Sequence, residues 1–193
     1  MASDNIFFDT GKLRSLGKKA IIGKTVRIRR PELAEIGTGS IIDDFTYVST
    51  ALSVGKYTHI GAGTHIVGGA QAKVSIGNFA NIAPGCNIVA GQHNYWTSGL
   101  MGPAIPAKYC AKDGEVAPVK IGDHALLGCG TVVLPGVVIP EGMATGAHTL
   151  LKKKEYKPWT LYVGPDAREI GKREGAAAKE AAAKLMKDPE LWI

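Results

Sequence analysis

The chain has 193 residues, of which 45% are hydrophobic and 21% are charged. This length and composition can bury one sizeable core, so we expect a single domain with appendages. The formal net charge of +6 comes from 23 basic and 17 acidic residues. Such a moderate excess suits phosphate-bearing small molecules better than nucleic acid, because no basic stripe interleaved with aromatic residues accompanies it. On charge alone, a solvated basic surface without a partner is equally compatible.

The cysteines and the N-terminal residues exclude two further classes. Cys86, Cys110 and Cys129 are odd in number and lack the spacing of a metal site. Cys86 falls on an inward small-residue position, and we interpret it as a core filler. Residues 1–10 contain no apolar run, and apolar stretches elsewhere end well short of the ~18 residues of a membrane span. We therefore expect a soluble, cytoplasmic protein with no metal and no membrane insertion.

The predicted elements begin with a lead-in over residues 1–20 that is irregular or partly helical. An aliphatic residue then recurs at Ile22 and Ile28 and, after Pro31 interrupts the register, almost every sixth position from Ile36 onward. These later positions form three runs: Ile36, Ile42, Val48, Val54, Ile60 and Ile66; Ile76, Ile82 and Ile88; and Ile121, Leu127, Val133, Ile139, Thr145 and Leu151.

A six-residue repeat is neither the 3.6-residue period of a helix nor a plain two-residue alternation. It indicates short strands separated by corners and stacked as a parallel β-helix, in which three hexads make one triangular coil. Glycine often follows the aliphatic position, as at Gly37 and Gly61, where we expect it to supply the unusual backbone angles of a tight corner. A β-sandwich is disfavoured, because turn signals every 8–12 residues would not keep a spacing of six.

Two segments interrupt the repeat. Residues 68–71 insert four residues, and residues 90–118 lengthen the step from Ile88 to Ile121 to 33 positions. We predict that residues 90–118 leave the prism as one extended loop without strands, and a loop of that length usually carries function.

The hexads stop at residues 152–154, so the sequence predicts a β-helix domain over residues 21–154 and a C-terminal extension over residues 155–193. Within the extension, the alanine-rich residues 175–186 predict a helix. Glu180 and Lys184 form a favourable i,i+4 pair in it.

Together these features resemble a known family. The motifs that carry the resemblance, besides the hexads and the long loop, are Val133-Leu134-Pro135-Gly136-Val137, Pro158-Trp159 and Tyr162-Val163-Gly164-Pro165-Asp166-Ala167-Arg168. Over roughly residues 20–173 the chain is similar to the hexapeptide-repeat acyltransferases, most of all the bacterial sugar acetyltransferases that modify surface-polysaccharide precursors. The resemblance implies an all-β, left-handed parallel β-helix with a C-terminal α-helix. That hand runs against the usual right-handed crossover rule.

The function that the resemblance implies is acetyl transfer from acetyl-CoA to the amino group of a nucleotide-linked 4-amino-4,6-dideoxy sugar, for O-antigen or lipopolysaccharide biosynthesis. O-acetylation of a galactoside or polysaccharide hydroxyl is the alternative. A γ-type carbonic anhydrase would need a His-x4-His pair, which the histidines at 59, 65, 93, 124 and 148 do not form. A non-catalytic assembly module is disfavoured by the elaborate loop.

Acyl transfer to an amine or hydroxyl needs a base near the acceptor proton, and histidine titrates near neutral pH. His93 lies where the family's long loop leaves the coil, so we predict it as the catalytic base, with Asn94 and Tyr95 binding substrate; a histidine that only packs the loop is the alternative. His59 and Asn81 each precede an inward position. Counting faces puts them on one face of neighbouring coils, about 4.8 Å apart, where they would bind substrate or face solvent.

The resemblance places acetyl-CoA along the last coils, with its pantetheine arm against small residues and its phosphates near lysines. The predicted contacts are Ala125, Gly128, Cys129, Gly146, Ala147, Lys152 and Lys153. Lys154 continues the same charge run, for which a solvated surface is equally compatible.

Two more features concern the flanks of the prism. Arg27, Arg29 and Arg30 are interpreted as a solvated strand in preference to a phosphate contact. Outward Tyr47, Tyr57 and Phe79 would be exposed in a monomer, and the resembling family forms trimers. We therefore expect near six coils per chain and a cyclic homotrimer in which the His93 loop of one chain closes over the terminal coils of its neighbour.

Overall fold

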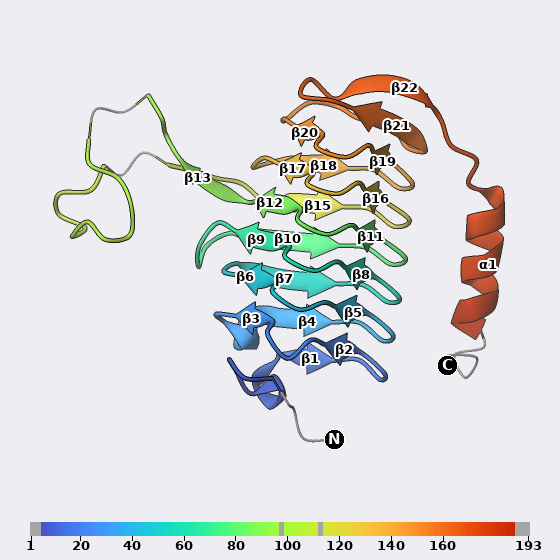
Figure 1. Cartoon of the computed structure of the whole chain (residues 1–193), viewed down its shortest axis with the longest axis horizontal. Coiled ribbons are helices and arrows are strands. Elements are labelled where there is room, and N and C mark those ends of the chain that lie inside the picture. The colour runs from blue at the N-terminus through green and yellow to red at the C-terminus, as the bar shows by residue number, and fades with distance from the viewer. Residues whose placement is uncertain (1–4, 97–98, 112–113, 188–193) are drawn as a thin grey trace.

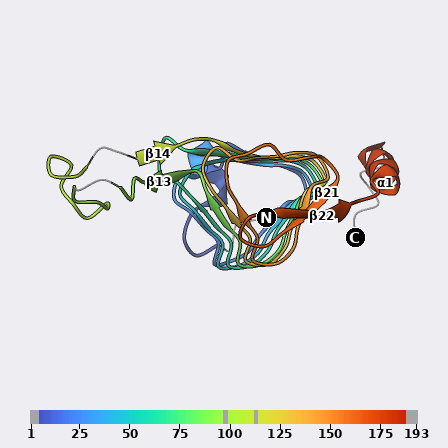
Figure 2. The same ribbon diagram turned by 90° about the horizontal axis from the view of Figure 1, so that it is seen from above.

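The protein is a parallel β-helix, seen here in a computed structural model that describes residues 5–96, 99–111 and 114–187. Three sheets of short parallel strands wrap around one axis (Figures 1 and 2). Sheets A and C have six strands each, so the prism has six complete coils, as predicted. Among the described residues, no helix is long and apolar enough to cross a membrane.

Each coil contributes one strand to each sheet. Sheet A contains β1 (Ser15–Leu16), β4 (Ala34–Ile36), β7 (Ala51–Val54), β10 (Lys73–Ile76), β15 (Val119–Ile121) and β18 (Val138–Ile139). Sheet B contains β2 (Ile21–Ile22), β5 (Ile41–Ile42), β8 (His59–Ile60), β11 (Asn81–Ile82), β16 (Leu126–Leu127) and β19 (Ala144–Thr145), and it ends with β21 (Thr160–Val163) and β22 (Arg168–Lys172). Sheet C contains β3 (Arg27–Ile28), β6 (Tyr47–Val48), β9 (His65–Val67), β12 (Asn87–Val89), β17 (Val132–Val133) and β20 (Leu150–Leu151).

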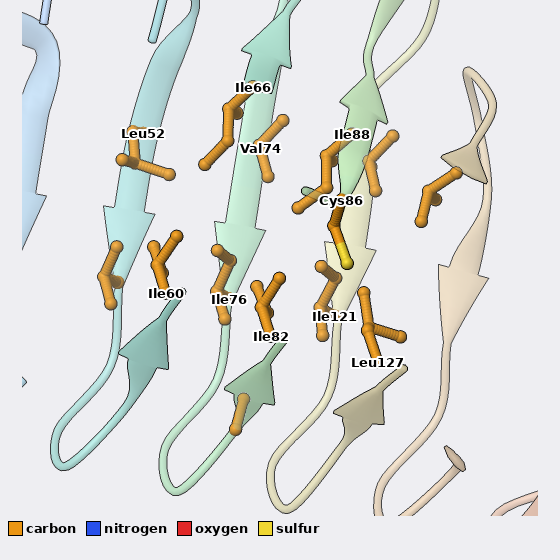
Figure 3. Close-up of a cluster of buried hydrophobic side chains, with 14 of the residues drawn as sticks. Leu52, Ile60, Ile66, Val74, Ile76, Ile82, Cys86, Ile88, Ile121 and Leu127 are labelled. Atoms are coloured by element: carbon orange, nitrogen blue, oxygen red, sulfur yellow. The ribbon is translucent and has the colours of Figure 1, made fainter. Parts of the chain in front are cut away.

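The aliphatic residue of each hexad points into the prism, as the repeat predicted. Ile60, Ile66, Ile82 and Ile88 are completely buried, and Figure 3 shows such side chains turned toward one another between the sheets. The parallel register places aliphatic residues of successive coils next to one another, so that Val54 pairs with Ile76 and Ile76 with Ile121. Each buried isoleucine contributes roughly 1.5–3 kcal/mol relative to an exposed one, and the stack forms one continuous core.

The corners differ from the expectation about glycine. A Cβ atom on Gly37 would lie 2.2 Å from the oxygen of Gly55, and one on Gly55 would lie 2.5 Å from the carbonyl carbon of Gly77. These glycines therefore permit close stacking of successive coils and do not supply left-handed backbone angles. Left-handed φ values fall on other glycines, such as Gly39 (68°) and Gly63 (69°), and also on larger residues, including Tyr57 (53°) and Phe79 (55°).

Four of the larger left-handed residues form an aromatic ladder along one corner: Tyr57, Phe79, His124 and Trp159. Neighbouring ring centroids are 5.6, 5.2 and 5.7 Å apart, a separation at which aromatic rings attract. Tyr57 and Phe79, expected to be exposed in a monomer, are thus half-buried within the single chain.

The first coil includes part of the expected lead-in. After the 3-10 helix Thr10–Lys12, β1 pairs with β4, so that Leu16 lies beside Ile36. A second 3-10 helix, Pro31–Leu33, occupies the place where the hexad register breaks. The coil therefore begins before residue 21.

The long excursion leaves the prism after β12 and returns at β15 (Figure 1). Its base is a two-stranded antiparallel hairpin of β13 (Gly91–His93) and β14 (Gly114–Val116), where no strand was expected. The pairing satisfies backbone N–H and C=O groups that would otherwise lie unpartnered against the coil.

The C-terminal extension closes the other end. β21 adds a rung to sheet B, and β22 runs antiparallel to β21. The predicted helix is present as α1 (Ala176–Lys187), with Lys184 Nζ 2.7 Å from Glu180 Oε1. Figure 2 shows α1 on the side of the prism opposite the hairpin of the excursion.

Candidate active site at the base of the excursion

His93 is the last residue of β13, opposite Gly114 in the hairpin. The hairpin fixes its backbone, while its side chain is exposed and lines two adjoining hollows. We call the larger hollow, about 790 Å³ between the coil and the excursion, the corner pocket. The smaller hollow, about 590 Å³, is lined by His93 together with Asn94 and Tyr95, the other two residues predicted at this place.

The corner pocket is built by the segments that follow successive strands of sheet C. Arg30 follows β3, Ser49 follows β6, Gly68 follows β9 and Gly91 follows β12, and all four line the pocket. Stacked coils bring these segments to one corner although they are far apart in sequence.

Glycine allows the excursion to lie directly on this corner. A Cβ atom on Gly68 would lie 2.7 Å from the nitrogen of Gly91, and one on Gly91 would lie 2.6 Å from the oxygen of Gly68. Larger residues would push the hairpin away from the coil, since such separations are far below van der Waals contact. His93 owes its position against the pocket to this close approach.

Arg29 and Arg30 also line the corner pocket, a position that their sequence did not predict. Nη1 of Arg30 donates a 2.8 Å hydrogen bond to the backbone oxygen of Ser49, and Nη1 of Arg29 donates a 3.4 Å bond to the Tyr47 hydroxyl. The solvated-strand interpretation stays a prediction for these two side chains, since Arg29 is exposed and Arg30 is half-buried, and both line the pocket with His93. Counting one coil from Arg30 to Ser49 and another to Gly68 is the signal that could have found them.

His59 and Asn81 adopt the predicted relationship. They pair in register in sheet B, on adjacent coils. Sheet B lies across the prism from the hairpin, so one chain does not bring these two side chains to His93 (Figure 1). Their role in substrate binding stays a prediction that requires a second copy of the chain.

His59 has a partner that sequence reasoning missed. Its Nε2 lies 2.8 Å from Oδ2 of Asp43, with 42% and 40% of the two side chains exposed. In contrast, the His93 ring makes no hydrogen bond within the described part of the chain. The signal for the pair is again coil spacing, because Asp43 directly follows the strand that pairs with β8.

The residues predicted to bind the donor lie in the last coils. Cys129 and Ala147 are exposed, whereas Ala125 is fully buried and its backbone groups bond to Gly122 and Asn81. Gly128 and Gly146 lie on stacked coils that approach closely. A Cβ atom on Gly128 would lie 2.6 Å from the Gly146 carbonyl carbon, so only glycine fits there.

The lysines that follow β20 differ in their availability. Lys154 donates to the backbone oxygens of Asp166 and Ala167 at 3.0 and 3.1 Å, which ties it to the closing segment. Lys152 forms only a 3.6 Å exposed pair with Asp166, and an exposed pair of this kind is worth about 0–1 kcal/mol. The ammonium groups of Lys152 and exposed Lys153 therefore remain available to bind a phosphate.

The cysteine interpretation holds. Cys86 is fully buried, its Sγ donates to the oxygen of Gly128 at 3.3 Å, and burial raises the pKa of its thiol to about 11. The thiol is therefore neutral near pH 7 and fills the core. Among the residues that the structure describes, no group of three His, Cys, Asp or Glu side chains is placed to hold a metal ion.

Comparison with known proteins identifies the class. The chain is 30% identical over 176 residues to the dTDP-4-amino-4,6-dideoxy-D-glucose acyltransferase of Escherichia coli. The aligned region covers 86% of this chain and 88% of that protein. A maltose O-acetyltransferase of Clostridium difficile 630 shares 21% identity over 85% of this chain and 72% of that one, with a TM-score of 0.55, and shows the fold alone. No protein-family model matches the sequence.

Two crystal structures of AntD, an N-acyltransferase from Bacillus cereus, are closely similar. The complex with dTDP and 3-hydroxybutyryl-CoA has a TM-score of 0.84 and 30% identity, over 96% of this chain and 100% of AntD. A variant bound to dTDP-4-amino-4,6-dideoxyglucose and coenzyme A has a TM-score of 0.83 and 31% identity, over 95% and 98%. The fold is thus that of the left-handed β-helix acyltransferases, which confirms the predicted hand. Within them, the chain belongs to the family of sugar N-acyltransferases that contains the Escherichia coli enzyme and AntD.

Proposed function

We propose that this protein transfers an acetyl group from acetyl-CoA to the 4-amino group of a dTDP-linked 4-amino-4,6-dideoxy sugar. The relatives are acyltransferases of such a sugar or bind it together with coenzyme A. The observation that carries the proposal is His93, an exposed imidazole without a hydrogen-bond partner in the described chain, at a pocket of about 790 Å³. That volume lies within the usual range for small-molecule sites, about 300–1,000 Å³.

The reaction requires little of the protein beyond position and a proton acceptor. The sugar nitrogen attacks the thioester carbonyl carbon, an amide C–N bond forms, and the C–S bond breaks to release coenzyme A. The nitrogen loses a proton to His93, which returns it to the leaving thiolate. Imidazole suits this exchange because it titrates near the operating pH.

The donor would approach along the last coils. Exposed Cys129 and Ala147 give the pantetheine arm a shallow surface, and Lys152 and Lys153 offer charge to the phosphates at the end of the coil. No metal takes part in this proposal.

A cyclic homotrimer would complete the site. Outward residues of sheet B, including Ile21, Ile41 and Leu126, form an apolar row interrupted by His59 and Asn81. Ile21 is 50% exposed, and a neighbouring copy on this face would cover it. The same contact would bring the excursion of one chain toward the donor coils of the next.

We further propose that the enzyme works in the cytoplasm. Its product would serve the assembly of lipopolysaccharide precursors.

The test is turnover of the purified protein, measured as release of free thiol from the acyl donor. Acetyl-CoA and 3-hydroxybutyryl-CoA are each offered with dTDP-4-amino-4,6-dideoxyglucose, with its 4-hydroxy counterpart and with a simple galactoside. Thiol release that requires the amino sugar supports the proposal. Release with the hydroxyl acceptors alone would instead make the protein an O-acetyltransferase.

A further inference from the structure

The corner pocket has a basic wall that acyl transfer itself does not use. We propose that Arg29 and Arg30 bind the diphosphate of the nucleotide-linked acceptor and thereby direct its amino sugar toward His93. This inference rests on the proposed function and names the part of the site that recognises the nucleotide. The relevant wall lies in the first coil, whereas His93 belongs to the excursion that leaves the fourth.

Arg30 is held in a fixed position. It is half-buried, its Nη1 donates to the oxygen of Ser49 at 2.8 Å, and Pro31 and the following 3-10 helix restrain its backbone. That hydrogen bond engages one of the five N–H donors of a guanidinium. The planar fork can therefore still donate to a phosphate while the side chain stays in place.

The two guanidiniums carry uncompensated charge. Neither forms an ion pair with a carboxylate among residues 5–96, 99–111 and 114–187. Two adjacent positive charges in a concave wall focus the field and raise the local concentration of anions. Arginine also bonds phosphate oxygens in pairs, with geometry as well as charge.

The rest of the lining suits the rest of the nucleotide. Val67, Ile105 and Val116 supply apolar surface, and Gly68 and Gly69 add no side chains that would fill the pocket. The Arg30 guanidinium reaches the Ser49 segment, two rungs before Gly91, which is roughly 10 Å at about 4.8 Å per rung. A hexose attached to a diphosphate at the arginines would extend along the corner toward His93.

The acyl donor is a poorer occupant of this wall. In sheet C the order of strands is β20-β17-β12-β9-β6-β3, so the arginines after β3 and the lysines after β20 lie on opposite sides of the excursion (Figure 1). Two phosphate-bearing substrates then have two separate basic sites. The excursion, and His93 with it, lies between them.

The experiment compares an Arg29→Gln, Arg30→Gln double variant with Arg27→Gln. Arg27 is the matched control, because it lies in β3 just before the two arginines, is exposed and stacks over the ring of Phe7 at 5.9 Å outside the pocket. We expect the double variant to raise the KM for the dTDP-linked amino sugar by about 10- to 100-fold. The KM for acetyl-CoA should stay unchanged, and Arg27→Gln should behave as wild type.

Calorimetric binding of dTDP and of thymidine separates this inference from the proposed function, since neither measurement needs turnover. The double variant should lose affinity for dTDP by a similar factor and bind thymidine as wild type does. Arg30→Lys should fall between, because it keeps charge without the fork. If the wild type binds dTDP through the arginines but transfers nothing, only the proposed function fails. An unchanged dTDP affinity in a folded double variant, or no dTDP binding by the wild type, overturns the inference.

Discussion

His93, predicted as the base, and His59, predicted to bind substrate or face solvent, lie on opposite sides of the prism in different surroundings. His59 is positioned by Asp43 on the flat face of sheet B, beside a small hollow of about 350 Å³. His93 has no such partner in the described chain but lies against the corner pocket. We expect His93 and not His59 to act as the base, since a base must be within reach of the proton it removes.

The strongest test of this comparison exchanges each histidine for alanine. We expect His93→Ala to lower kcat by about 10²–10⁴-fold, the usual effect of removing a positioned base. His59→Ala should lower it by far less, and both variants should keep the wild-type circular dichroism spectrum. Wild-type turnover in His93→Ala would remove that residue from the mechanism. If the acceptor amine is already neutral when it binds, the loss of kcat should be near the lower end of this range.

A second test asks whether the donor reaches His93 from the last coils. Replacing Lys152 and Lys153 with alanine should raise the KM for acetyl-CoA by about tenfold and leave kcat nearly unchanged, because phosphate contacts are equal in ground and transition states. Lys154→Ala is the matched control. It should lower the melting temperature, since Lys154 bonds two backbone oxygens, with little effect on that KM. Equal KM values in all three proteins would assign Lys152 and Lys153 to solvent.

The third test asks whether the two sides of the prism meet between copies. Mixing a His93→Ala chain with one that lacks Lys152 and Lys153 should restore activity at subsaturating acetyl-CoA if base and donor site come from different subunits. Random assembly would give about a quarter of the sites both parts intact. Activity that only equals the average of the two separate variants would place a complete site in each chain.

The smallest expected effect concerns Asp43. Asp43→Asn should change the free energy of unfolding by about 0–1 kcal/mol, because the pair is substantially exposed. Turnover should change less than it does in His93→Ala. If Asp43→Asn instead lowered kcat as strongly as His93→Ala, then His59 would be the base and the comparison would reverse. Urea melts and initial rates measure both quantities.

The hexad sequence by itself determined the coil, because the residue of each hexad that faces the core is set by the local geometry of its strand. An aliphatic residue at every sixth position, as at Ile60 and Ile66 or at Ile82 and Ile88, leaves no other arrangement that buries all of them, and the structure has them buried. The helix over residues 176–187 was likewise predictable from alanine content alone. Leu16 was missed because a single strand before the first repeat shows no period.

Only the tertiary structure decided the composition of the site. Arg30 and His93, or Asp43 and His59, meet through stacked coils, and insertions such as residues 68–71 change the sequence spacing that corresponds to one coil. The hairpin under His93 has no periodicity, and it lies against the coil because Gly68 and Gly91 permit backbone contact. Inward positions follow from local strand geometry and can be counted along the chain, whereas a corner collects side chains from several coils and exists only once they are stacked.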